Sequence, residues 1–236
     1  HIKNIPAQLL FIEQLEGTLE DLIHEDNFSQ ELLISGLFQI TFALAYMQKY
    51  YKFTHNDLHI NNIMYKYTDK KFLYYKINNT YFKVPTFGRI FKIIDFGRAI
   101  FTFKQKTYMN DVFSREGEAG GQYAYPYQVD FLQKKSSNNI QPNYHFDLCR
   151  LSITILDEIK RLDESPMNNT MMSFLQLLVT DCNNNSLCDC EDDFNLYINI
   201  AKNANHALPR DIINHSIFKQ YRITKKMFPK KSYYSM

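Results

Sequence analysis

Two stretches decide how this chain of 236 residues folds and functions: His55-Asn56-Asp57-Leu58-His59-Ile60-Asn61-Asn62, and the apolar run Phe91-Lys92-Ile93-Ile94 followed by Asp95-Phe96-Gly97. Asp57 and Asp95 supply carboxylates, and Asn62 adds a side-chain amide oxygen. Phosphoryl transfer needs a carboxylate that orients and deprotonates an acceptor hydroxyl, together with oxygen ligands for Mg²⁺. The three side chains therefore fit the roles of a base and two metal ligands in one site.

These stretches resemble the catalytic loop H-R-D-L-x-x-x-N and the D-F-G motif of the protein-kinase superfamily, and the step of five residues from Asp57 to Asn62 is kept. The resemblance implies that Asp57 is the catalytic base and that Asn62 and Asp95 bind Mg²⁺. It also implies that ATP is the phosphate donor and that Phe96 packs to set the loop conformation.

Two positions in the catalytic loop depart from the usual kinase pattern. Asn56 stands where most kinases have Arg, which removes the cation that a phosphorylated activation loop would neutralise. Activation by loop phosphorylation is therefore not expected. His59 stands where most Ser/Thr kinases have Lys and where haspin-like kinases and aminoglycoside phosphotransferases have His, so its imidazole is a third candidate catalytic group that could donate to a phosphate oxygen. We expect His55 to pack structurally.

The opening segment from Leu9 to Gly17 looks like the last strand of a kinase small lobe running into the hinge. The resemblance implies that Glu13 and Leu15 offer backbone groups to adenine, with Met64 and Ile94 as further nucleotide contacts. No Gly-rich phosphate loop can be placed, and no strand Lys with a helical Glu partner. We therefore expect the chain to be a fragment whose small lobe lies upstream of His1.

Two later segments extend the resemblance, which runs from about residue 9 to about residue 156. The stretch 146–151 resembles the start of the central large-lobe helix, in which Asp147 would accept hydrogen bonds from catalytic-loop amides. The stretch 121–127 falls where the peptide-docking end of an activation segment would lie, although no A-P-E follows the D-F-G motif. The resemblance to the kinase family therefore says least about how the substrate is recognised.

The predicted fold is mainly α with short β-hairpins, a kinase-like C-lobe over residues 18–236 preceded by the last N-lobe strand and hinge over residues 1–17. Thr18 and Ser29 are predicted helix caps. The second helix should bury one face, formed by Leu33, Leu37, Ile40, Leu44 and Met47. Further helices are predicted around residues 148–159, 171–179 and 194–201. An inserted hairpin is predicted at about 65–90, turning at Asn78-Asn79-Thr80.

Composition is that of an ordinary globular domain, with 45% apolar residues, 22% charged residues and a net charge of +2. The apolar stretch 32–47 falls short of the ~20 residues that span a bilayer, so we expect a buried helix and no membrane. The basic C-terminal tail is expected to be solvated, and nucleic acid is not an expected partner. With Asn, Lys, Ile and Tyr abundant and Trp absent, the chain resembles the Ser/Thr kinases of large DNA viruses. A cytoplasmic location is therefore predicted, with the cytoplasm of a host cell or the virion as the viral alternatives.

The segment 181–192 allows two metal sites as minor alternatives to an acidic surface loop. Cys182, Cys188 and Cys190 could ligate zinc, although the paired spacing of structural zinc sites is missing. Asp181 and Asp192 take the first and twelfth positions of an EF-hand-like loop, but Ser186 stands where Gly is needed.

The leading functional prediction is an ATP-dependent kinase that phosphorylates Ser or Thr of a protein substrate, completed by the upstream N-lobe of the same protein. Asp57 to Asn62 lacks the Ala-Ala-Arg or Arg-Ala-Ala insert of tyrosine kinases. The runner-up is a small-molecule kinase of the aminoglycoside or choline type. A pseudokinase that binds a partner through the Tyr-rich hairpin and the basic tail is the non-enzymatic alternative.

Overall fold

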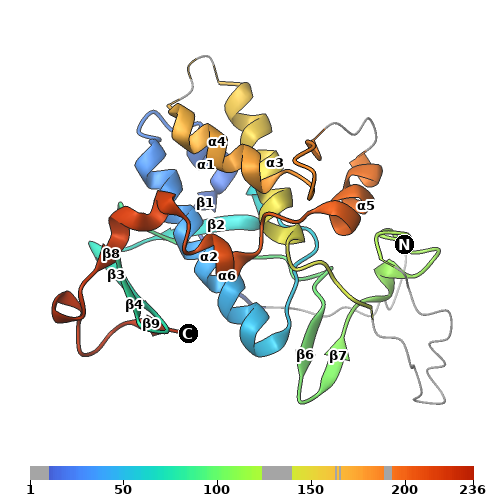
Figure 1. Cartoon of the computed structure of the whole chain (residues 1–236), viewed down its shortest axis with the longest axis horizontal. Coiled ribbons are helices and arrows are strands. Elements are labelled where there is room, and N and C mark those ends of the chain that lie inside the picture. Colours follow the sequence, from blue (N-terminus) through green and yellow to red (C-terminus); the bar gives the residue numbers. More distant parts are fainter. Residues whose placement is uncertain (1–10, 124–139, 163, 165, 189–192) are drawn as a thin grey trace, which may run out of the picture.

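One long helix, α2 (Gln30–Tyr51), forms the centre of the fold (Figure 1). The structure is a computed structural model that describes residues 11–123, 140–162, 164, 166–188 and 193–236. As predicted, Ser29 caps α2 by accepting a hydrogen bond from the Leu32 N–H at 3.3 Å. The predicted apolar face is buried, as expected, and burial extends beyond that face, because every residue from Leu32 to Phe42 is buried. Neighbouring elements surround this part of the helix.

The polar residues within α2 connect the helix to strands. Ser35 donates to the Pro85 carbonyl at 2.5 Å, and the buried Gln39 side chain accepts a hydrogen bond from the Phe91 N–H at 3.1 Å. Gly36 allows close approach, since a Cβ there would lie 3.0 Å from the Phe91 ring. By length and hydropathy alone α2 could cross a membrane, but 72% of its most apolar window is buried inside the protein, as in a core helix.

The first sheet has the order β1-β2-β5 and is antiparallel. Its strands are β1 (Gly17–Thr18), β2 (Ile63–Tyr67) and β5 (Arg89–Ile93). Helix α1 (Leu19–Ile23) follows β1 directly and begins with the predicted cap: the Asp21 N–H donates to the Thr18 hydroxyl at 3.1 Å, and Thr18 N–H donates to the Asp21 carboxylate at 2.8 Å. The reciprocal bonds satisfy amide groups that a helix start would otherwise leave unpaired.

The predicted hairpin is present, as β3 (Phe72–Ile77) and β4 (Thr80–Pro85), in antiparallel register around Asn78-Asn79. Two C-terminal strands complete this second sheet: β8 (Arg222–Ile223) pairs with β4, and β9 (Tyr234–Ser235) pairs with β3 in parallel. The prediction of a simply solvated tail was therefore wrong for its backbone. Most of its side chains are exposed as predicted, among them the lysines at 225, 226, 230 and 231.

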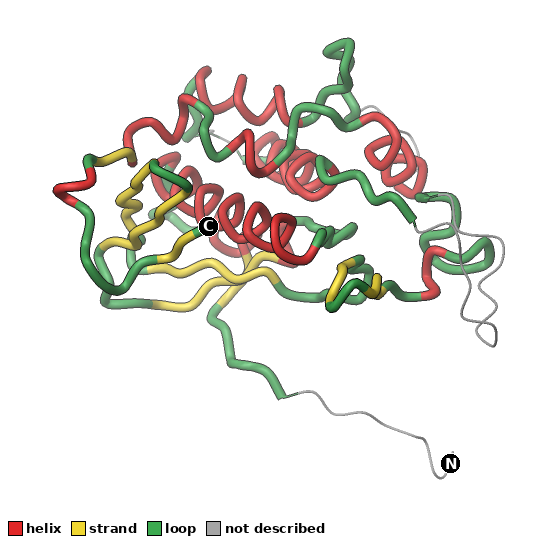
Figure 2. The backbone as a smooth tube through the Cα atoms, turned by 60° about the horizontal axis from the view of Figure 1, so that its bottom comes forward, coloured by secondary structure: helices red, strands yellow, loops and turns green. Residues whose placement is uncertain are grey.

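The second half of the described chain is mainly helical, as predicted. Its α-helices are α3 (Phe146–Lys160), α4 (Asn169–Leu178), α5 (Asp193–Asn203) and α6 (Pro209–Ile212). Shorter elements are η1 (Ile60–Asn62), η2 (Asp111–Phe113), η3 (Ser216–Tyr221), η4 (Lys225–Met227) and the hairpin β6 (Phe101–Phe103) with β7 (Lys106–Tyr108). The helices gather on one side of the long strands (Figure 2).

The opening segment differs from its prediction. Residues 11–16 form no strand, and Leu9 and Leu10 lie outside the described residues. Phe11 is 91% exposed and Ile12 is 71% exposed, and Figure 2 shows this segment running away from the strands. A strand needs a hydrogen-bonded neighbour, and pairing in the described chain starts only where the Glu16 N–H donates to the Tyr65 carbonyl at 2.9 Å.

Phe38 gives a direct test of the packing around α2. Its buried ring contacts Tyr75 of β3, Phe82 of β4 and Phe218 of η3 at centroid distances of 5.2, 5.0 and 5.2 Å. Phe38→Ala should lower the free energy of unfolding by about 3–5 kcal/mol, because it leaves a cavity between three elements. Urea denaturation measures the loss. Tyr50→Ala on the exposed side of the same helix is the control, and equal losses for the two variants would contradict this packing.

Candidate active site

The ends of β2 and β5 bring the two sequence motifs together. Asn62 directly precedes β2, and Asp95 lies two residues after β5. Ile63 faces Ile93 across the two strands, and the Ile94 N–H donates to the Asn62 carbonyl at 3.0 Å. The hairpin between the motifs therefore does not separate them. The two predicted metal ligands come from adjacent strand ends.

Asp147, in the first turn of α3, holds the catalytic loop as predicted. Its buried carboxylate accepts hydrogen bonds from the His55 and Asn56 N–H groups, one on each oxygen and both at 2.9 Å. Burial raises the pKa of the Asp147 carboxyl, while the nearby His55 and the two amide bonds act in the opposite direction. Using both oxygens as acceptors is the arrangement that suits the ionised carboxylate.

His55 is a packing residue, in agreement with its prediction. It is fully buried, and its Nε2 lies 2.8 Å from the Ile94 carbonyl oxygen. The Phe96 ring lies 5.6 Å from the imidazole, so His55 contacts residues on both sides of Asp95. The imidazole thus links the catalytic loop to the D-F-G segment without facing solvent.

Asn56, which stands in the place of the usual Arg, is a buried uncharged residue whose side chain forms hydrogen bonds with several segments. Its backbone is left-handed with φ of 65°, a conformation that Asn adopts more readily than most residues. The side chain donates to the Arg98 carbonyl at 3.0 Å and accepts a hydrogen bond from the Tyr123 hydroxyl at 2.7 Å. Tyr123 belongs to the predicted peptide-docking stretch 121–127, of which residues 124–127 lie outside the described residues.

Asn62 holds the loop through its amide nitrogen. Its Nδ2 donates to the Asp57 carbonyl at 2.9 Å and lies 3.1 Å from the His59 Nε2. An amide nitrogen can only donate, so His59 Nε2 accepts and the ring proton is on Nδ1. Burial lowers the pKa of His59, which favours this neutral form. His59 therefore positions Asn62 through Nε2, and only Nδ1 is left as a donor to a phosphate.

Asn62 and Asp95 offer oxygen ligands of the kind that Mg²⁺ prefers. Since Asn62 uses Nδ2 for the loop, its Oδ1 is the atom left for a cation. The exposed Asp95 has a left-handed backbone (φ 58°), and its Oδ1 accepts a hydrogen bond from the Gly97 N–H at 3.2 Å. Within the described ranges no cluster of three or more His, Cys, Asp or Glu side chains could hold a metal. The pair suits Mg²⁺, which keeps several waters and needs few protein ligands.

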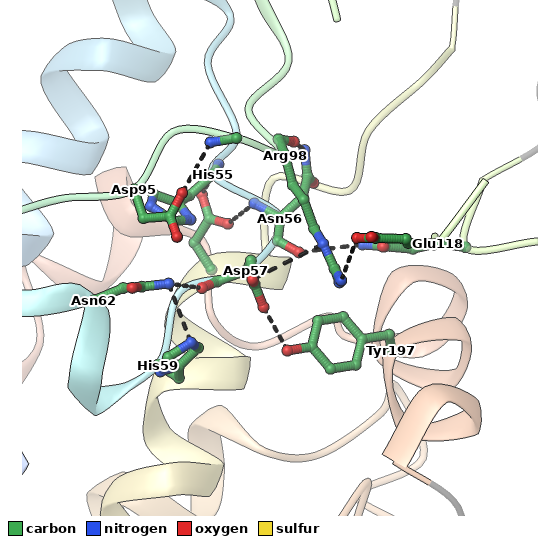
Figure 3. A network of polar contacts seen from close by, with 12 residues as sticks. His55, Asn56, Asp57, His59, Asn62, Asp95, Arg98, Glu118 and Tyr197 are labelled. Atoms are coloured by element: carbon green, nitrogen blue, oxygen red, sulfur yellow. Dashed lines mark hydrogen bonds and ion pairs between the residues drawn. The ribbon is translucent and has the colours of Figure 1, made fainter. Parts of the chain in front are cut away.

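Asp57 is held by two residues that the sequence motifs did not assign to the site (Figure 3). Its Oδ1 accepts a hydrogen bond from the Tyr197 hydroxyl at 2.5 Å, and its Oδ2 lies 3.9 Å from Nε of Arg98. The Arg98 guanidinium also lies 4.0 Å from the Glu118 carboxylate. Arg98 could have been found from its place directly after the D-F-G motif. Tyr197 belongs to α5, more than a hundred residues later, and no motif marks it.

The predicted nucleotide contacts lie around the first sheet. Glu13 forms ion pairs with Lys66 of β2 and, at 3.4 Å, with Lys92 of β5. The pKa of Glu13 is lowered, and the hydrogen bond from Lys66 is the largest cause. Met64 faces Lys92 across the strands, and Ile94 follows Lys92 by two residues. Glu13, Met64 and Ile94 thus share one side of the sheet, and Leu15 lies beside β2.

The segment from Asp181 is closed by its own hydrogen bonds. Oδ1 of Asp181 accepts from the N–H groups of Asn183 and Asn185, both at 2.8 Å. Cys182 is an exposed free thiol. Cys190 and Asp192, which the zinc and calcium alternatives need, lie outside the described residues.

Comparison with known proteins relates part of the chain to kinases. No protein-family model matches it. Serine/threonine-protein kinase haspin of Bos taurus is 32% identical over 111 residues, 47% of this chain and 14% of that protein. The haspin homolog of Drosophila melanogaster is 31% identical over 121 residues, 50% of this chain and 21% of that protein. A putative serine/threonine-protein kinase of Acanthamoeba polyphaga mimivirus is 40% identical over 82 residues, 32% of this chain and 21% of that protein.

These similarities support a relationship to serine/threonine-protein kinases. They extend over no more than 50% of the chain, and the chain in turn spans at most 21% of the length of these three relatives. The kinase resemblance inferred from residues 55–62 and 95–97 is thus supported at the level of the family, and this support extends to neither activity nor substrate.

Asp147→Ala should destabilise the protein strongly. The substitution leaves two buried N–H donors without an acceptor, at a cost of about 1–3 kcal/mol each. Chemical denaturation monitored by circular dichroism measures the change. Asp157→Ala, at an exposed position of the same helix, should change the stability by less than about 0.5 kcal/mol. Similar stability changes for the two variants would show that Asp147 does not hold the loop.

Proposed function

We propose that the chain is the large lobe of an ATP-dependent serine/threonine protein kinase that acts on protein substrates. One arrangement carries the proposal: a loop held by the buried Asp147 places Asp57 and Asn62, and the β2–β5 pairing places Asp95 beside Asn62. These are the base and the two metal ligands that phosphoryl transfer requires. The similarity to proteins named serine/threonine-protein kinases supports the same reaction.

In this mechanism Asp57 accepts a hydrogen bond from the acceptor hydroxyl, orients it and receives its proton. The Asn62 amide oxygen and the Asp95 carboxylate would hold Mg²⁺, and His59 keeps Asn62 oriented through Nε2. The metal ion, when bound, neutralises charge on the phosphate oxygens. Glu13, Leu15, Met64 and Ile94 bind the nucleotide at the edge of the first sheet, where the upstream N-lobe would cover it.

The contact between the catalytic loop and the segment after it favours a protein acceptor. Tyr123 donates to the buried Asn56, so the described start of the stretch in which peptide docking is predicted, residues 121–123, is joined to the loop that carries the base. An acceptor peptide bound along this stretch would approach Asp57. We accordingly propose a protein substrate in the cytoplasm, with no membrane or nucleic acid as a partner.

Asp57→Asn and Asp95→Asn should each lower phosphate transfer by at least about 100-fold in the full-length protein. The first removes the base and the second removes a metal ligand, and both act chiefly in the transition state. The assay is Mg²⁺-dependent transfer of the γ-phosphate of ATP to a protein mixture and to a panel of small alcohols. The matched control is Asp69→Asn, in the loop that leads into β3, which should retain full activity.

Labelling of proteins that is lost in Asp57→Asn would establish the proposed reaction. Labelling of alcohols alone would assign the protein to the small-molecule kinases. Unchanged transfer by both site variants would reject the assignment of the base and the metal ligand, and absence of transfer by the wild-type protein would favour a pseudokinase that only binds partners.

A further inference from the structure

An internal phenol engages the candidate base. The Tyr197 hydroxyl donates to Asp57 Oδ1 at 2.5 Å, within the distance at which an acceptor hydroxyl would bind the same carboxylate. Tyr197 lies on α5, far from the catalytic loop in the sequence, and Figure 3 shows its ring pointing from this helix to Asp57. The contact is thus a tertiary feature that links α5 to the site.

Several groups fix the Tyr197 side chain in this position. The guanidinium groups of Arg98 and Arg150 lie 5.4 and 5.0 Å from the centre of its ring. The Phe146 ring, from the start of α3, lies 5.8 Å away. Burial raises the pKa of the Tyr197 hydroxyl, so it keeps its proton and remains a donor to Asp57.

The helix that carries Tyr197 is itself anchored beside the catalytic loop. Asn143 donates through Nδ2 to the carbonyls of Ala201 and Ala204, at 3.2 and 2.9 Å, and so caps the end of α5. Asn143 lies just before α3, the helix whose Asp147 holds the loop. Asp147 of α3 therefore fixes the backbone of the loop, and Tyr197 of α5 fixes the Asp57 carboxylate of the same loop.

The two oxygens of Asp57 have different surroundings. Oδ1 has a short bond to Tyr197, whereas the nearest cationic group at Oδ2 in the described chain is Arg98 Nε at 3.9 Å. The side chain keeps 21% of its surface exposed. Oδ2 is accordingly the oxygen that can receive an acceptor hydroxyl while Tyr197 stays in place.

We propose that Tyr197 is a positioning residue for phosphoryl transfer: its hydroxyl fixes the Asp57 carboxylate through Oδ1 and leaves Oδ2 directed to the acceptor. The inference rests on the proposed function and adds a residue that the kinase motifs do not contain. A carboxylate whose rotation is already restricted spends less free energy on orientation when the acceptor binds. The role is exerted through Asp57, so the effect of Tyr197 must disappear when Asp57 is removed.

Tyr197→Phe tests this role because it removes only the hydroxyl and keeps the ring between its neighbours. In the full-length protein kcat should fall about 10-fold, the loss expected for a hydrogen bond to a charged group, while KM for ATP stays unchanged. Tyr46→Phe is the matched control. Tyr46 is a partly exposed tyrosine of α2 whose ring contacts Phe42 and Tyr50, away from the site.

A double-mutant cycle with Asp57→Ala distinguishes positioning from general packing. Tyr197→Phe should have no further effect on the residual turnover of Asp57→Ala, because the group through which it acts is gone. In thermal unfolding, Tyr197→Phe should lower Tm by about 2–4 °C in the wild-type background and not in the Asp57→Ala background. Equal effects of the substitution in both backgrounds would overturn the inference.

Two further outcomes have definite meanings. A rise in turnover in Tyr197→Phe would show that the phenol occupies the place of the acceptor, and the positioning role would be rejected. If the wild-type protein transfers phosphate to no acceptor, the proposed function fails. The unfolding cycle then decides the inference alone: coupled effects retain the contact that orients Asp57, and additive effects reject it.

Discussion

The buried carboxylate of Asp147 is the interaction on which the site depends. The carboxylate accepts hydrogen bonds from two backbone N–H groups in the interior, away from solvent, where an unpaired donor costs free energy. These bonds fix the path of the chain through His55 and Asn56. The next residue is Asp57, whose direction follows from this path. Helix α3 is packed in the hydrophobic core, and its Asp147 holds in place a loop that has little regular secondary structure of its own.

Local signals in the sequence predicted much of the fold. The caps at Thr18 and Ser29 and the turn at Asn78-Asn79 depend on neighbours within a few residues, so their structure follows from short-range chemistry. Asp147 was found differently, through its place in a family motif. The sequence also indicated that α2 is buried, but not which elements cover it, because these strands and helices come from distant parts of the chain.

The same distinction explains what was missed. Strands β8 and β9 have only two residues each, too few for a periodic pattern, and they exist because a preformed hairpin offers two edges. Residues 11–15 show the opposite case, since the strand predicted there does not form and backbone pairing begins only at Glu16. For the candidate site, the motifs pointed to Asp57, Asn62 and Asp95, but not to Tyr197, which reaches Asp57 through the packing of α5 against α3.

The pairing of the C-terminal strands with the hairpin also bears on how the protein is made. A ribosome releases β3 and β4 long before β8 and β9, so the nascent hairpin has two unpaired edges for much of synthesis. Exposed edges are templates for pairing with other chains. The outward Lys76 and Lys83 carry like charges that would repel a second copy during this interval. In the finished protein each late strand pairs with two residues of one edge, which shortens the backbone left open to another chain.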